Sequence, residues 1–444
     1  MEREVRPNYH LFKTKENPDH EGTGRNVYFV DSVTPPGMKT SHAYIRQNLS
    51  ETLSIAKTEK GEEGLASMPF TERVRYLESI AQKEQYKRWE ETTGVKPEDT
   101  RFIFGTPIYN EQRMGASSMI MAHVAADIPT SAHVDHVYVT NRCTDGSEDL
   151  VLKHMSSFGE TKTGLPITDL GNFSFDPQIE PIYSMAQVGN HRHIHIDTRT
   201  PSKANVWRIL TEMGVYQNIP IIMSHDANVF VAPNGPMKLF KEAHKSFVLK
   251  EDDAVIVSAV TPEYVDPKKL DPTLKDTNLS PRQILPFGLL VPEQHRVNGK
   301  FAAWDPQFYS DRNGRGIPPS KLDDVVMAKQ AEKHGRIFKH VSEVLSYEWG
   351  VPTLEGRKKM LTRFTTGYLQ IANGLGLREV SPEIKFFEDP DYREHVLFEN
   401  AKDKRLEGHL PLTISMWHQA VGKGYEDFLK DPHNPAFEGI EGSK

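Results

Sequence analysis

The sequence has little of several features that mark particular protein classes. Cysteine occurs once, as Cys143, which excludes an intramolecular disulfide and fits a reducing compartment. No uncharged apolar run approaches the roughly 18 residues that cross a bilayer, and the first residues lack the apolar stretch of a secretory signal. Basic residues are not in excess, since 54 Lys plus Arg stand against 61 Asp plus Glu. We therefore expect a soluble, cytoplasmic protein with no integral membrane association and no nucleic acid as partner.

What is present indicates a folded core with an extension at each end. The 444 residues, with 37% hydrophobic and 26% charged, are typical of a globular protein of two or three domains. Residues 1–100 are predicted to form a partly helical extension, which could be a structural appendage or a homo-oligomer contact. Residues 376–444 are predicted to be mostly helical, with residues 382–387 as a strand or a partner contact and 410–429 as two short helices.

Between the extensions, residues 101–375 alternate between strand and helix patterns. Strands are expected at residues 101–105, 136–140, 193–197, 219–223 and 254–260, and helices at 114–126, from Glu148, and at 203–213. About forty less regular residues, containing Gly and Pro, are expected between the helix from Glu148 and the strand at 193–197. Alternating strands and helices predict an α/β fold with a parallel sheet, and such sheets bind ligands beyond the carboxyl ends of their strands.

One polar pair follows a buried strand directly. Asp226 and Asn228 come just after the apolar run 219–223, so their oxygens should lie at the sheet edge where a ligand binds. Oxygen ligands suit a hard divalent cation such as Mg²⁺ or Mn²⁺. The alternative is that both residues are ordinary turn formers at a strand end.

A second candidate site lies further along the chain. Asp323 and Asp324 are adjacent, and repulsion between two carboxylates can raise the pKa of one toward the range of a general base. Alternatively, both could simply favour the N-terminus of the following helix through its dipole. The polar, glycine-containing stretch 300–321 precedes them and could be an acceptor-binding loop carrying Trp304, Tyr309 and Arg312, or a disordered loop.

His191, His193 and His195 alternate along an expected strand, which places all three on one face. A zinc site would need further ligands from other segments. We therefore favour the alternative, a polar surface at a strand end.

Several motifs in order resemble the catalytic domain of family 2 glycosyltransferases, which has the GT-A (Rossmann-like) fold. The matching segments are Pro-Ile-Tyr-Asn-Glu at 107–111, Asn-Arg-Cys-Thr-Asp-Gly-Ser at 141–147, Pro-Ser-Lys-Ala-Asn at 201–205, Asp-Ala-Asn at 226–228, Asp-Asp at 323–324, Lys-His-Gly-Arg-Ile at 333–337, residues 347–354, and residues 360–367 with Arg363. The chain departs from the family pattern at Asn228, where Asp is usual, at Met360 for Gln and at Phe364 for Trp.

The resemblance implies a role for each matched position. It implies a mixed, mainly parallel sheet flanked by helices, with residues 101–260 as the nucleotide-binding half and 261–375 as the acceptor half. The nucleotide-sugar would contact Pro107, Tyr109, Glu111, Asp145, Lys203, Asp226 and Arg363, and the metal ion would contact Asp226 and Asn228. Asp324 would be the base, beside Asp323. By its residues alone, Asp145 could equally be a turn and helix cap, and Lys203 a solvated lysine.

The function implied is transfer of a sugar from a nucleoside-diphosphate sugar to a small or soluble acceptor. By resemblance the reaction would be metal-assisted and inverting, although some relatives retain configuration. Two alternatives remain open. One is a sugar-phosphate nucleotidyltransferase, and the other is a non-catalytic protein of the same fold that binds nucleotides or protein partners, which the departures at Asn228, Met360 and Phe364 would explain.

Overall fold

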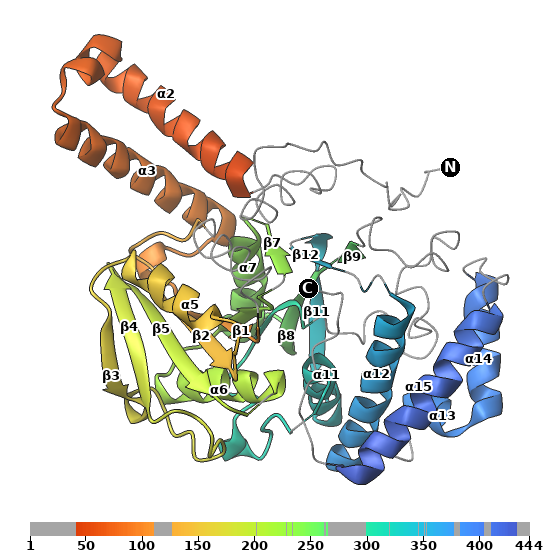
Figure 1. The fold of residues 1–444 in the computed structure, drawn as a ribbon. Helices are drawn as coiled ribbons and strands as arrows, with labels where there is room; N and C mark the ends of the chain where they lie inside the picture. The colour runs from red at the N-terminus through yellow and green to blue at the C-terminus, as the bar shows by residue number, and fades with distance from the viewer. Residues whose placement is uncertain are drawn as a thin grey trace.

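The computed structural model describes most of the chain (Figure 1). The described residues are 41–110, 127–200, 202–227, 229–232, 234–261, 263–264, 299–318, 320–344, 346–349, 351, 353–376, 382–403 and 410–432. The expected helix at 114–126 lies outside them, as do Glu111 and Asn228. None of the helices within these ranges combines the length and apolar character that a membrane span requires.

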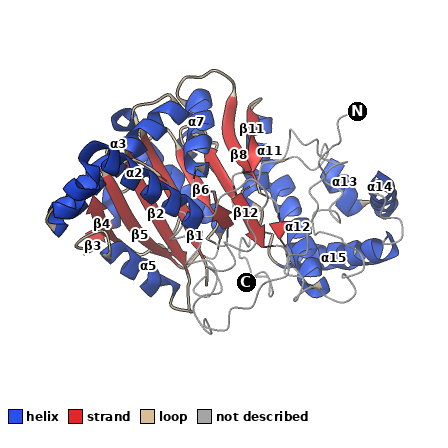
Figure 2. Ribbon diagram, turned by 90° about the horizontal axis from the view of Figure 1, so that it is seen from above, coloured by secondary structure: helices blue, strands red, loops and turns tan. Residues whose placement is uncertain are grey.

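A nine-stranded sheet runs through the molecule in the order β11-β8-β10-β6-β1-β2-β5-β4-β3 (Figure 2). Its strands are β1 (Arg101–Ile108), β2 (His133–Asn141), β3 (Lys162–Pro166), β4 (Ile182–Val188), β5 (His191–Thr198), β6 (Ile222–His225), β8 (Ala254–Val260), β10 (Phe301–Trp304) and β11 (Ile337–Val344). A second sheet pairs β7 (Val229–Val231), β12 (Ser346–Trp349) and β9 (Glu263–Tyr264).

Strand directions make the large sheet mixed but mainly parallel. β6, β1, β2 and β5 are parallel neighbours, and β8 is parallel to β11. β10 runs antiparallel between β6 and β8, and β4 runs antiparallel between β5 and β3. The predicted α/β class is therefore confirmed. The sheet also joins the two predicted halves, because β10 and β11 come from the segment assigned to the acceptor half.

Helices cover both faces of this sheet, and the side chains of β1 show how. Ile103 packs in the larger apolar core, while Phe102 and Phe104 pack in a second core on the opposite face, as the alternation of a strand dictates. The first face is covered by α6 (Lys203–Tyr216) and α11 (Asp323–Lys333), and α12 (Leu354–Leu375) packs on α11. The second is covered by α3 (Phe70–Thr93) and α7 (Gly235–Phe247).

The helix α6 lies unusually close to β1. A Cβ atom at Gly105 would come within 2.3 Å of the Leu210 side chain, so only glycine permits this contact. The helix begins at a cap in which the Ser202 hydroxyl accepts from the backbone N–H of Asn205 at 3.3 Å. Close packing and the cap together fix Lys203, the first residue of α6, near the end of the sheet.

The two extensions are helical. α2 (Ser41–Ser67) and α3 form a hairpin that projects from the body, and α3 is anchored by Trp89, whose indole stacks on Phe102 with ring centroids 6.2 Å apart (Figure 1). The C-terminal helices are α13 (Pro382–Glu388), α14 (Pro390–Asp403) and α15 (Leu410–Lys430). α15 packs on α12, where the Thr366 hydroxyl donates to the Gly424 carbonyl at 3.2 Å.

Three local predictions were wrong. Residues 382–387 are helical and not a strand, because Ile384, Phe386 and Phe387 bury their side chains with Trp417 of α15. Residues 410–429 form one helix, and the less regular stretch expected before the strand at 193–197 contains β3 and β4. The remaining helices are α5 (Ser147–Ser156) and the short 3₁₀ turns η1 (Pro97–Asp99), η2 (Ile167–Asp169) and η4 (Asp311–Asn313).

Candidate functional site

The carboxyl ends of four parallel strands meet at one edge of the sheet. Ile108 at the end of β1 lies opposite Thr140 of β2, and Asn141 lies opposite Thr198 at the end of β5. β6 joins β1 on the other side and ends at His225, directly before Asp226. This edge is where a parallel α/β sheet places its ligands.

Lys203 is the centre of a charged cluster at this edge. Its Nζ lies 2.6 Å from Oδ1 of Asp226 and 2.8 Å from Oδ2 of Asp323, and it donates to the Gly299 carbonyl at 2.9 Å. The Trp207 ring closes another side, with its centroid 5.0 Å from Nζ. The side chain of Lys203 is only 20% exposed, so it is not the solvated lysine that was one alternative.

Asp226 is held from two sides. Besides Lys203, its other oxygen, Oδ2, pairs with Nζ of Lys300 at 3.3 Å, and its backbone N–H donates to the Lys300 carbonyl at 3.0 Å. Burial alone would raise the pKa of Asp226, but Lys203 and Lys300 overcome it and hold the pKa below its ordinary value. The same attraction, exerted by Asp226 and Asp323, raises the pKa of Lys203 against the effect of burial. The cluster is therefore charged near neutral pH.

The two carboxylates of the acidic pair, Asp323 and Asp324, have different partners. Asp323 is 5% exposed and ion-paired with Lys203, and its Oδ1 lies 3.9 Å from Nη2 of Arg363. Asp324 instead accepts from the backbone N–H of Gly299 at 3.2 Å and of Val325 at 2.9 Å. Burial, followed by the charge of Asp323, raises the pKa of Asp324. Asp323 therefore faces two cations, whereas the Asp324 carboxylate is held by backbone N–H groups.

Gly299 allows these groups to come together. A Cβ atom there would lie 2.7 Å from Cβ of Asp324 and 3.0 Å from Oδ2 of Asp323. Any side chain at this position would push the acidic pair away from Lys203. Gly299 and Lys300 were not predicted, because their importance comes from their long-range contacts with α6 and α11.

The residues predicted to line the nucleotide occupy the neighbouring strand ends. Pro107 and Tyr109 are half-buried at the end of β1. The Asn110 side chain accepts from the backbone N–H of Thr144 at 2.7 Å, which ties the loop after β1 to the loop after β2. Asp145 in that second loop accepts from the N–H of Ser147 at 3.0 Å and from its hydroxyl at 2.6 Å, so it performs the turn role that was part of its alternative, while the cap position of α5 is Gly146.

The described residues do not fit a divalent ion at Asp226. Both carboxylate oxygens already face lysine ammoniums, and an ion bound to them would lie a few Å from two positive charges. Two unit charges 4 Å apart repel by about 4 kcal/mol near a protein surface, and a doubly charged ion would double that cost. No group of three or more His, Cys, Asp or Glu side chains within the described ranges is placed to hold a metal ion. Asn228, the other predicted ligand, lies outside those ranges.

Comparison with known proteins gives structural matches only. No protein-family model matches the sequence, and no curated protein matches it. Among solved structures, the chain is similar to the mannosyltransferase PcManGT from Pyrobaculum calidifontis in complex with GDP-Man and Mn²⁺, at 15% identity and a TM-score of 0.45, over 86% of this chain and 99% of that chain. It is also similar to S. aureus TarS, at 11% identity and a TM-score of 0.35, over 74% of this chain and 54% of that one.

A third match is glucosyl-3-phosphoglycerate synthase from Mycobacterium tuberculosis, at 10% identity and a TM-score of 0.38, over 65% of this chain and 85% of that chain. At such identities and TM-scores these matches describe general architecture and not activity.

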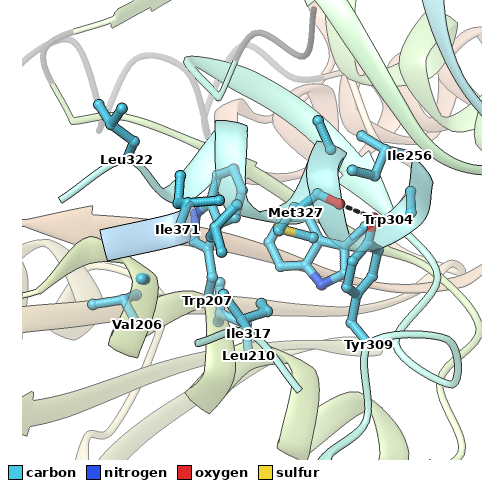
Figure 3. Close-up of a cluster of buried hydrophobic side chains, with 14 of the residues drawn as sticks. Val206, Trp207, Leu210, Ile256, Trp304, Tyr309, Ile317, Leu322, Met327 and Ile371 are labelled. Atoms are coloured by element: carbon cyan, nitrogen blue, oxygen red, sulfur yellow. Dashed lines mark hydrogen bonds between the residues drawn. The ribbon is translucent and has the colours of Figure 1, made fainter. Parts of the chain in front are cut away.

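Two of the three predicted acceptor residues belong to the core. Trp304 is fully buried in β10, stacks on Trp207 with centroids 4.8 Å apart and donates to the Thr211 hydroxyl at 2.9 Å. Tyr309 is 1% exposed, and its hydroxyl donates to the Met327 carbonyl at 3.0 Å (Figure 3). Neither side chain has surface to offer an acceptor, so their assignment was wrong. Arg312 is exposed, but it pairs with Glu212 at 3.1 Å and shows no contact with the charged cluster.

The three histidines lie on one face of β5, as their alternation predicts, but they are buried and do not form a polar surface. His191 contacts His136 of β2, with Nδ1 and Nε2 3.3 Å apart, and His193 stacks on His136 with centroids 4.6 Å apart. His195 lies 2.8 Å from the Thr140 hydroxyl. Burial lowers the pKa of His193 to about 3 and that of His195 to about 4.

This histidine row predicts a loss of stability in acid. An imidazole in the unfolded chain has a pKa of about 6.5, whereas in the folded protein the pKa is about 3 for His193 and about 4 for His195. The unfolded state therefore binds more protons, and the free energy of unfolding should fall as pH drops from about 6.5 toward 4. One pKa unit is worth about 1.4 kcal/mol, so His193 alone should lower the free energy of unfolding by about 3–3.5 kcal/mol at pH 4. Urea denaturation at several pH values measures this.

The matched variants for that experiment are His193→Leu and His395→Gln. His395 is an exposed residue of α14, far along the chain from β2 and β5, so its replacement keeps the buried row intact. The slope of stability against pH should become shallower in His193→Leu and stay as in the wild type in His395→Gln. Equal slopes in all three proteins would contradict the role given to His193.

Proposed function

We propose that this protein is a glycosyltransferase that moves a sugar from a nucleoside-diphosphate sugar to a small or soluble acceptor. The observation that carries the proposal is the convergence of four distant segments on one point of the sheet edge. Lys203, Asp226, Lys300 and the pair at 323–324 form a single cluster in which positive and negative groups alternate, and Arg363 adjoins it. Clusters of this kind at the carboxyl ends of parallel strands suit binding of a phosphorylated ligand.

The cluster divides the chemistry of glycosyl transfer between its members. The leaving group is a nucleoside diphosphate, which gains negative charge as its bond to the anomeric carbon breaks. Lys300 and Arg363, with side chains 33% and 26% exposed, can reach such a group, and a guanidinium binds phosphate oxygens as a planar fork. Preorganised positive charges of this kind stabilise the charge that develops in the transition state.

Asp324 supplies the base in this proposal. The acceptor hydroxyl attacks the anomeric carbon and transfers its proton to the Asp324 carboxylate, while the bond from that carbon to the diphosphate oxygen breaks. Direct displacement inverts the anomeric configuration. The raised pKa of Asp324 brings the carboxylate closer to the range in which a general base is effective. Pro107, Tyr109 and Asp145, at the ends of β1 and β2, would then line the nucleoside.

The proposal is tested with a thermal-shift screen of nucleoside-diphosphate sugars, followed by incubation of the hit with candidate acceptors. A ligand at 100 times its dissociation constant stabilises by about 2.7 kcal/mol, which should raise the melting temperature by about 2–4 °C in a chain of this size. Release of free nucleoside diphosphate that requires an acceptor would support transfer.

Two outcomes would replace this proposal. Pyrophosphate formed from a nucleoside triphosphate and a sugar phosphate would identify the chain as a nucleotidyltransferase instead. Stabilisation by nucleotides without any turnover would favour the non-catalytic alternative.

A further inference from the structure

The surroundings of the Lys203 ammonium have the composition of a cation site. Three oxygens lie within 3 Å of Nζ, namely Oδ1 of Asp226, Oδ2 of Asp323 and the Gly299 carbonyl. Carboxylate and backbone carbonyl oxygens are the ligands that hard cations take in proteins. These three come from the end of β6, the start of α11 and the segment before β10, so they converge only in the folded chain.

Several features of the fold hold the Lys203 ammonium at this position. Lys203 is the first residue of α6, a helix fixed by its Ser202 cap and by close packing of Leu210 on Gly105. Gly299 is the residue whose missing side chain lets the acidic pair reach Nζ. Trp207, one turn further along α6, covers the remaining side with an aromatic ring.

Two further cations, Lys300 and Arg363, lie next to the carboxylates that surround the Lys203 ammonium. Lys300 pairs with Oδ2 of Asp226, the oxygen that does not face Lys203. Arg363 lies 3.9 Å from Oδ1 of Asp323, which also does not face Lys203. Both side chains are more exposed than that of Lys203, so solvent or a ligand has better access to their positive charges. The aligned pair Asp-x-Asp of the resembling family is Asp226 and Asn228 here, so one of its two negative charges is absent from the sequence.

We infer that Lys203 is a built-in substitute for the divalent cation, and that Lys300 and Arg363 bind the diphosphate of the donor without a metal ion. This inference rests on the proposed function and concerns the same site. Asp226 and Asp323 are then positioning residues, which hold three cations in place for the diphosphate. Lys300 becomes a donor-binding residue in addition to those that the sequence indicated.

The test is calorimetric binding of UDP, GDP, ADP, CDP and dTDP, first in excess EDTA and then with Mn²⁺ in place of EDTA. We expect at least one nucleoside diphosphate to bind in EDTA, with a dissociation constant that Mn²⁺ changes by less than about twofold. Lys300→Gln should weaken this binding about tenfold or more, the usual effect of removing one charge-assisted contact. Lys162→Gln, at an exposed lysine of β3, is the matched control and should bind as the wild type does.

A second readout uses the metal alone. Electron paramagnetic resonance of Mn²⁺ should show the same free-ion signal with the wild type as with Asp226→Ala. The inference is overturned if the wild type takes up Mn²⁺ and Asp226→Ala does not, or if nucleotides bind only when Mn²⁺ is present. Both of those results leave the proposed function standing. If no nucleoside diphosphate binds under either condition, the inference and the proposed function fall together.

Discussion

Replacement of Asp324 by asparagine is expected to lower kcat by about 10²–10⁴-fold, the usual contribution of a general base. The donor should still bind, because asparagine has nearly the same shape and its side-chain oxygen can still accept from the N–H of Gly299 or Val325. The measurement pairs turnover with calorimetric donor binding, using the donor and acceptor found in the screen. A loss in kcat with little change in the donor dissociation constant is the expected pattern.

The pH dependence of the wild type gives an independent check. Because burial and Asp323 raise the pKa of Asp324 above its ordinary value of 3.8, the carboxylate is protonated at higher pH than a free aspartate. Activity should therefore fall on acidification through an ascending limb whose apparent pKa lies above 3.8. That limb should be missing from the residual activity of Asp324→Asn. Asp253→Asn, at a carboxylate that is 75% exposed and paired with Arg336, is the control and should keep full activity. An unchanged kcat in Asp324→Asn would show that Asp324 is not the general base.

Replacement of Lys203 by methionine is expected to be the most damaging change to stability. Asp226 and Asp323 are 14% and 5% exposed, and loss of their shared cation would leave buried negative charge poorly compensated. Removing one partner of a buried pair costs about 3–5 kcal/mol of unfolding free energy. Lys300 and Arg363 lie farther from these oxygens, at 3.3 and 3.9 Å, and replace only part of the attraction. Urea denaturation at pH 7 measures the difference from the wild type.

A matched control and a pH series distinguish this effect from a loss of packing. Lys57→Met removes an ion pair with Glu62 in which both side chains are largely exposed, so it should leave the free energy of unfolding almost unchanged. In the wild type, Asp226 contributes stability above its unfolded pKa and loses it as pH falls through its lowered folded pKa. Lys203→Met lacks that contribution, so the difference in free energy of unfolding between the wild type and the variant should become smaller in acid. A difference that does not change with pH would indicate that lost packing is the cause.

The sequence predicted the architecture well where local pattern controls it. The run of apolar residues at 219–223 indicated a buried strand, and the residue after that strand, Asp226, lies at the sheet edge because parallel strands end together at one edge of their sheet. The same holds for the strand expected at residues 101–105 and for the start of α6 at Lys203. Each of these features is encoded within a few consecutive residues.

Prediction failed where burial depends on distant partners. Trp304 and Tyr309 lie in a polar, glycine-containing stretch that has the composition of a loop, yet β10 inserts between β6 and β8 and carries Trp304 into the core. Residues 382–388 are helical because α15 offers them an apolar face. The histidines of β5 look like a polar strand end in sequence, and their burial comes from β2 and α5.

By itself the sequence determined that the chain forms an α/β sheet, that Asp226 stands at its carboxyl edge, and that an acidic pair opens a later helix. Only the tertiary structure decided that Lys203 lies between these carboxylates and that Lys300 joins them. The physical reason is the range of the interactions. Strand and helix periodicity acts over a few residues, whereas the charge balance of the site is set by groups about 100 positions apart that meet only after the sheet has assembled.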